Sequence, residues 1–110
     1  MMTSAERYTY RVRYSAEDAE FVATVAEFPS LSWLAAKPAD AFSGIIALVS
    51  SVIADMQESG ETIPAPFGER EYSGKFQVRI TPEAHRQLVI AAAEQNVSLN
   101  RLAAKRLISA

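Results

Sequence analysis

The stretch GKFQVRITPEAHRQ, residues 74–87, changes from a strand pattern to a helix pattern within a few residues. Every second residue of KFQVRI is apolar, and these residues are Phe76, Val78 and Ile80. Such alternation is typical of a half-buried strand. Thr81 is then a good N-cap, and the proline and glutamate after it suit the first turn of a helix. The pattern predicts a strand over residues 75–80 and a helix that runs to about Gln95.

A second, shorter helix is predicted after a turn at Asn96, with Ser98 as its N-cap. One strand and two helices bury too little surface to fold alone, and units of this size often need oligomerisation. The simplest help is a second copy, so that two strands pair as an antiparallel ribbon with four helices behind it. The residues predicted for this dimer core are Phe76, Val78, Ile80, Leu88 and Leu102.

The polar residues of the same strand are predicted to face away from the helices. A two-stranded ribbon fits the major groove of DNA, where Gln can pair with adenine and Arg with guanine. We therefore expect base contacts from Lys75, Gln77 and Arg79. The start of the second helix offers free N–H groups to phosphates, and the residues expected there are Ser98, Leu99, Asn100 and Arg101. The alternative is a solvated edge strand, in which Lys and Arg discourage aggregation.

The front of the chain has a different organisation. Three strands are predicted, over residues 8–14, 21–28 and 30–36. After Pro38 the apolar residues follow a helical period, at Phe42, Ile45, Ile46, Val49, Val52, Ile53 and Met56. Gly60 suits the end of this helix, and a short edge strand is predicted near Thr62 and Ile63.

These residues resemble known families. The features G-K-F-x-V-R-I, T-P-E-x-H and V-S-L-N-R-L make residues 74–110 similar to a ribbon-helix-helix DNA-binding domain. EFVATVAEFPSL, the amphipathic helix and ESGETIPAP resemble the partial ribonuclease H-like domain of HicB-type antitoxins. The resemblance implies a front domain that neutralises a small HicA-type ribonuclease toxin. It also implies a back domain that dimerises and represses the promoter of its own operon.

The predicted fold class is α+β, with a small antiparallel sheet and one long helix in the order β-β-β-α-β, followed by a β-α-α unit. The predicted domains are residues 1–66 for toxin binding, 67–73 as a linker and 74–110 for dimerisation and DNA binding. The expected partners are operator DNA, a small basic toxin and a second copy of the chain, with pairing of dimers into tetramers left open. No cofactor, metal site or catalytic residue is expected.

Charge and composition agree with a binding protein that has two surfaces. Residues 74–110 hold six basic and two acidic side chains, a net charge of +4, against −6 for residues 1–73. A ribonuclease toxin must be basic to hold RNA, and an acidic inhibitor would attract it. The chain has no cysteine, so a disulfide framework is excluded. No uninterrupted apolar run approaches ~20 residues, and the charged N-terminus lacks an apolar signal core, which together predict a cytoplasmic protein without a membrane partner.

Several alternatives stay open from the sequence. Trp33, Phe28 and Glu27 are candidates for partner binding, although the two aromatic residues fit a core equally well. A solitary regulator, whose front domain senses a ligand or forms oligomers, is the main alternative function. A ribonuclease H-type enzyme would need several carboxylates around two metal ions, and no spacing of the front acids demands that. The single histidine, His85, is expected to be solvated or close to a phosphate.

Overall fold

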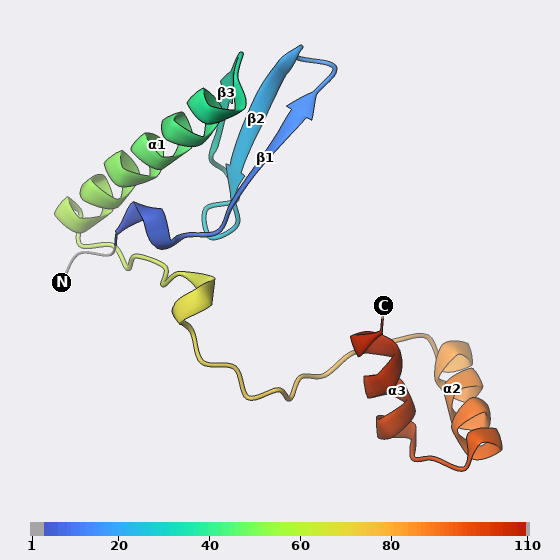
Figure 1. The fold of residues 1–110 in the computed structure, drawn as a ribbon. Helices are drawn as coiled ribbons and strands as arrows, with labels where there is room; N and C mark the ends of the chain where they lie inside the picture. Colours follow the sequence, from blue (N-terminus) through green and yellow to red (C-terminus); the bar gives the residue numbers. More distant parts are fainter. Residues whose placement is uncertain (1–3, 110) are drawn as a thin grey trace. The chain divides into compact units, whose positions relative to one another are not determined.

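The computed structural model describes residues 4–109 and divides the chain into two compact units, Met1–Tyr72 and Ser73–Ala110. The first unit contains a three-stranded sheet and one long helix, and the second contains two helices (Figure 1). The predicted α+β class is therefore confirmed.

The sheet of the first unit is antiparallel, in the order β1 (Tyr10–Ser15), β2 (Glu20–Val25) and β3 (Ser32–Ala35). The middle strand pairs with both neighbours, and Val12, Ala23 and Trp33 form one row across the three strands. The predicted hairpin and third strand are confirmed, with ends that differ by a few residues.

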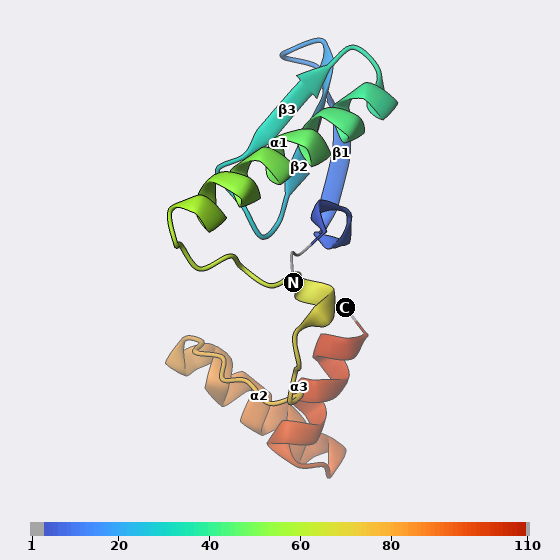
Figure 2. The same ribbon diagram turned by 90° about the vertical axis from the view of Figure 1, so that its left-hand side faces the viewer.

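Helix α1 (Pro38–Glu58) lies along one face of this sheet, as the two perpendicular views show (Figures 1 and 2). It begins at a proline, and the chain leaves it through Gly60 with a positive φ of 72°, a conformation that glycine adopts without strain. The buried residues of α1 fall at every fourth position: Ala41, Ile45, Val49 and Ile53. They form the core with Tyr8, Ala23, Val25 and Phe28.

Helix α1 also has the length and apolar composition of a membrane span, although its apolar residues are interrupted by polar ones. Its buried stripe packs against the sheet within the unit. An amphipathic helix that covers a sheet needs such a stripe, so this composition is explained by the core of the first unit.

The predicted edge strand after α1 is wrong. Thr62 and Ile63 lie in irregular structure, and the sheet ends at β3 within residues 4–109. The physical reason is local, because Pro64 and Pro66 lack the N–H groups that a strand ladder needs. The Pro64 carbonyl instead accepts a hydrogen bond from the Tyr8 hydroxyl at 2.8 Å.

In the second unit, α2 (Pro82–Gln95) and α3 (Leu99–Ile108) form as predicted. Thr81 accepts a hydrogen bond from the Ala84 N–H, and Ser98 accepts one from the Arg101 N–H, each at 3.1 Å. Asn96 adopts a left-handed conformation and ends α2. Both predicted caps and the turn are confirmed.

Residues 75–80 form no strand in the single chain. A strand is defined by hydrogen bonds to a neighbouring strand, and the three-stranded sheet contains only β1, β2 and β3. The predicted β-α-α order is thus observed as an unpaired segment followed by two helices.

Candidate nucleic-acid and partner interfaces

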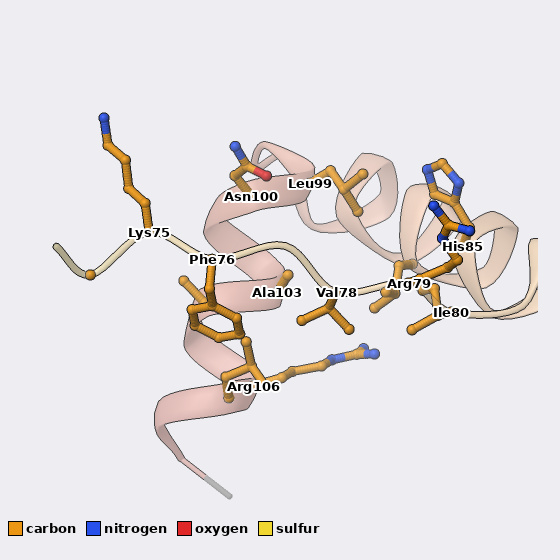
Figure 3. Close-up of a pocket in the computed structure, with 14 residues that line it drawn as sticks. Lys75, Phe76, Val78, Arg79, Ile80, His85, Leu99, Asn100, Ala103 and Arg106 are labelled. Atoms are coloured by element: carbon orange, nitrogen blue, oxygen red, sulfur yellow. The ribbon is translucent and has the colours of Figure 1, made fainter. Parts of the chain in front are cut away.

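Segment 75–80 leaves its apolar side chains largely uncovered within the second unit. The exposed fractions of Phe76, Val78 and Ile80 are 73%, 62% and 44%. Phe76 and Val78 point to one side of the segment, whereas Lys75 projects to the other (Figure 3). Lys75 and Phe76 thus point in opposite directions, as the alternation predicts, but the apolar side chains have no complete cover.

A cavity of about 770 Å³ lies beside this segment. Its apolar lining comes from the segment, from Leu88 of α2 and from Leu99, Ala103 and Leu107 of α3. Leu102 of α3 is buried, with 4% of its surface exposed. Of the five residues predicted for a dimer core, four line this cavity, and Leu102 is not among the lining residues. Apolar side chains gathered around one cavity make this region a candidate interaction surface.

The residues predicted for DNA contact are accessible. Lys75, Gln77 and Arg79 are exposed and form no ion pair among those found in residues 4–109. At the start of α3, Asn100 and Arg101 are exposed, while the Ser98 hydroxyl already caps the helix. His85 lines the cavity close to Arg79 (Figure 3). The second unit thus presents a cavity with an apolar lining whose edges also carry cations, among them Lys75, Arg79 and Arg106.

In the first unit, Trp33 lies on β3 with its indole against Gly44 of α1. No side chain fits at Gly44, because a Cβ there would overlap the indole ring. The exposed fraction of Trp33 is nevertheless 43%. One part of this side chain therefore packs on the helix and the rest is open to solvent or to a partner.

We predict that Gly44→Ala displaces the indole and destabilises the first unit by about 1–3 kcal/mol, the usual cost of overpacking. Trp33 is the only tryptophan, so its fluorescence should shift to the red as it becomes more solvated, and thermal unfolding should begin earlier. Gly68→Ala is the matched control, because no atom lies within 4 Å of a Cβ added there. Equal behaviour of the two variants would contradict the packing of Trp33 on Gly44.

The other two candidates for partner binding are buried. Phe28 and Glu27 each have an exposed fraction of 8%. The Phe28 ring packs edge-on against Tyr8, with 5.1 Å between the ring centroids. Only Trp33 of the three offers substantial surface to a partner.

Glu27 forms a buried polar cluster that the sequence did not reveal. Its carboxylate accepts hydrogen bonds from the Thr9 N–H at 3.0 Å, the Thr9 hydroxyl at 3.0 Å and the Phe67 N–H at 2.8 Å. Burial opposes ionisation of Glu27, but these hydrogen bonds outweigh it and lower the pKa. For the neighbouring Tyr10, burial and then the charge of Glu27 raise the pKa to about 12. The only sign of this cluster in the sequence was a single acidic residue near the end of an apolar predicted strand.

Because the pKa of Glu27 is lower in the folded than in the unfolded protein, ionised Glu27 stabilises the first unit above its ordinary pKa of 4.5. This stabilisation should disappear as the pH falls through the lowered pKa. Glu27→Gln should cost about 3 kcal/mol at pH 7, since hydrogen bonds to a buried charge are lost. Urea unfolding followed by Trp33 fluorescence measures the difference. A cost that stays constant from pH 7 to pH 3 would refute the role of the charge.

The sheet face opposite α1 carries Arg11 and Arg13 on β1, both exposed. On this face Val22 of β2 pairs with Arg13 of β1 and with Leu34 of β3, and the exposed fraction of Val22 is 7%. Most acids of the first unit lie elsewhere, in turns, helix ends and the segment after α1. Within residues 4–109, no group of three His, Cys, Asp or Glu side chains could hold a metal ion.

The architecture defines a class of protein: a small two-unit α+β chain with a basic helical unit that has an incomplete apolar face. The model of the HicB family matches residues 58–107, from the end of α1 through α3. This match supports a HicB-type protein and a role related to toxin–antitoxin systems. It does not include the three-stranded sheet. No curated protein and no solved structure matches the chain.

Proposed function

We propose that the chain is an antitoxin that neutralises a small HicA-type ribonuclease toxin through its first unit and represses its own operon through its second. The activity is binding rather than catalysis. The observation that carries the proposal is segment 75–80, whose apolar side chains are exposed and whose backbone lacks a strand partner. It lies inside the part of the chain that the HicB family model matches.

A second copy of the chain would complete the second unit. Two copies of segment 75–80 pair as an antiparallel ribbon in this arrangement, and each backbone then finds the hydrogen-bond partners that the single chain lacks. Phe76 and Val78 become buried against the helices, where each contributes about 1.5–3 kcal/mol of hydrophobic stabilisation. The ribbon-helix-helix dimer of the sequence resemblance thus agrees with the exposed surface of the monomer.

The same pairing would place Lys75, Gln77 and Arg79 of both copies on the outer face of the ribbon. This face has the width that the DNA major groove accepts and the side chains that read adenine and guanine. Arg101 and the N–H groups at the start of α3 would hold the phosphates on either side. Symmetry of the dimer would require two half-sites in the operator.

The first unit would supply the toxin-binding surface, for which Trp33 is the exposed aromatic candidate. Residues 1–73 carry a net charge of −6, which favours encounter with a basic toxin. The cations Arg11 and Arg13 on the uncovered sheet face make that face the less suitable one for such a partner. The surface around Trp33 and the acidic turns is therefore the proposed site.

The test of neutralisation is co-expression with a short basic reading frame next to this one. The expected result is a stable complex in size-exclusion chromatography and loss of toxin ribonuclease activity at equal molar amounts. If no neighbouring product binds, the solitary regulator is favoured. The observation that supports a solitary regulator is the extent of the family match, which covers most of the second unit and leaves out the sheet.

A further inference from the structure

The last residues of the first unit are docked on the rest of that unit rather than free. Residues 61–72, called the strap below, follow α1 and contain only one short 3-10 helix, η2 (Phe67–Glu69). Ile63 packs against the core, and Pro66 is buried. The sequence had predicted a linker over residues 67–73, where the structure places part of this strap.

Two hydrogen bonds to the buried residues Glu27 and Tyr8 hold the strap. The Phe67 N–H donates to Glu27, and the Tyr8 hydroxyl donates to the Pro64 carbonyl, both at 2.8 Å. An exposed ion pair, Arg7 to Glu69 at 3.2 Å, adds a contact of little energetic weight. Within the strap, Arg70 lies over the Phe67 ring and Tyr72 donates to the Phe67 carbonyl. Phe67 is thus the residue through which the end of the strap is attached.

We propose that the strap is a releasable tether, and that the hydrogen bond from Phe67 to Glu27 sets its length. With the strap docked, only Ser73 and Gly74 connect Tyr72 to the segment that begins at Lys75. With the strap released, the connection extends from Glu61 to Gly74. The fully extended reach then grows from about 7 Å to about 45 Å, at roughly 3.3 Å per residue.

The contacts allow the strap to leave while the rest of the unit stays folded. The strands are held by a continuous ladder and by the core under α1. The strap makes no ladder, and most of its residues are exposed. Segments with few buried contacts open at a lower free energy than the core, as separate units. Release would lengthen the connection between the binding surfaces of the two units. A longer connection changes the effective concentration of one surface at a partner that is bound to the other.

The test compares Phe67→Pro with Phe67→Ala in the full-length chain. Both variants lose the ring and its contact with Arg70, but only proline lacks the N–H that reaches Glu27. Proline fits this position, because Phe67 is the first residue of a helical turn and Pro66 already has the extended conformation required before a proline, with φ −55° and ψ 140°. Thr9 keeps its hydrogen bonds to Glu27 in both variants.

Hydrogen exchange of the strap and of strands β1–β3 is the readout. We expect exchange in the strap to be at least about tenfold faster in Phe67→Pro than in Phe67→Ala, the factor for one hydrogen bond to a charged group. Exchange in the strands should be equal in both. In Phe67→Pro, trypsin should cleave faster after Arg70, relative to cleavage after Lys75, which lies outside the strap. The radius of gyration of this variant should also increase. Equal strap exchange in the two variants, or strands that open together with the strap, would overturn the proposal.

Discussion

Replacing Phe76 with alanine is expected to convert the proposed dimer into monomers. The side chain is 73% exposed in the single chain, so its loss costs the monomer little. In the ribbon it would be a buried core residue, and truncation of such a phenylalanine costs about 3–5 kcal/mol per copy. Two copies together correspond to a dimer dissociation constant raised by at least about 10⁴-fold. Sedimentation equilibrium over a range of protein concentrations measures this change.

A matched control separates dimer contact from general loss of apolar surface. Ile108 is 86% exposed at the end of α3 and does not line the cavity beside the segment. Ile108→Ala should therefore leave the dimer almost unchanged. A Phe76→Ala protein that remains dimeric and folded would show that segment 75–80 is not the dimer core.

The second large effect is expected at Arg79. Arg79→Ala should cost roughly 1–3 kcal/mol of specific DNA binding and relax the base preference at one position in each half-site, because a two-pronged contact with guanine is lost. Arg101→Ala removes the same charge from the start of α3, where a phosphate contact is proposed. It should weaken binding to all sequences alike and lower the salt dependence by about one unit of slope. Binding-site selection with a randomised DNA library measures both effects.

Two further outcomes bear on this assignment. If Arg13→Ala, a charge change on the uncovered sheet face, has the same effect as Arg79→Ala, then only net charge matters. If Arg79→Ala keeps full affinity and base preference, the segment does not enter the groove. Either result would remove base readout from the proposal.

The sequence was sufficient for elements that local rules determine. The caps at Thr81 and Ser98 and the stop at Gly60 each combine a residue type with a strict conformational requirement. The long helix was predictable because its apolar residues keep a helical period over about four turns. The ends of the strands were less predictable from local rules. For example, β3 packs through Trp33 on Gly44 of α1, and no local sequence pattern connects these two residues.

The strap was not predictable from local patterns. Its position depends on Glu27 and Tyr8, which are far away in the sequence and resemble ordinary strand residues. Glu27 was therefore expected at a partner surface, whereas the structure uses it inside the first unit. The same limit applies to segment 75–80. Its alternation predicts a strand, but its hydrogen bonds require a partner that a single chain does not contain.

The cavity beside segment 75–80 connects the two proposed activities of the second unit. Apolar residues of the segment line the cavity, and the cations Lys75 and Arg79 of the same segment also lie along it. Dimerisation would thus determine the positions of the side chains that read the DNA bases. Loss of the dimer should therefore abolish DNA binding, whereas loss of the cations should leave the dimer intact.

The most direct test of this account is binding of the full-length protein to DNA from just upstream of its reading frame, at several salt concentrations. The Gln77→Ala/Arg79→Ala double variant is measured beside it. The account predicts tight binding by the parent that persists at physiological salt and is lost in the double variant. Weak binding that salt removes equally from both proteins would contradict it, because contacts with phosphates alone behave in that way.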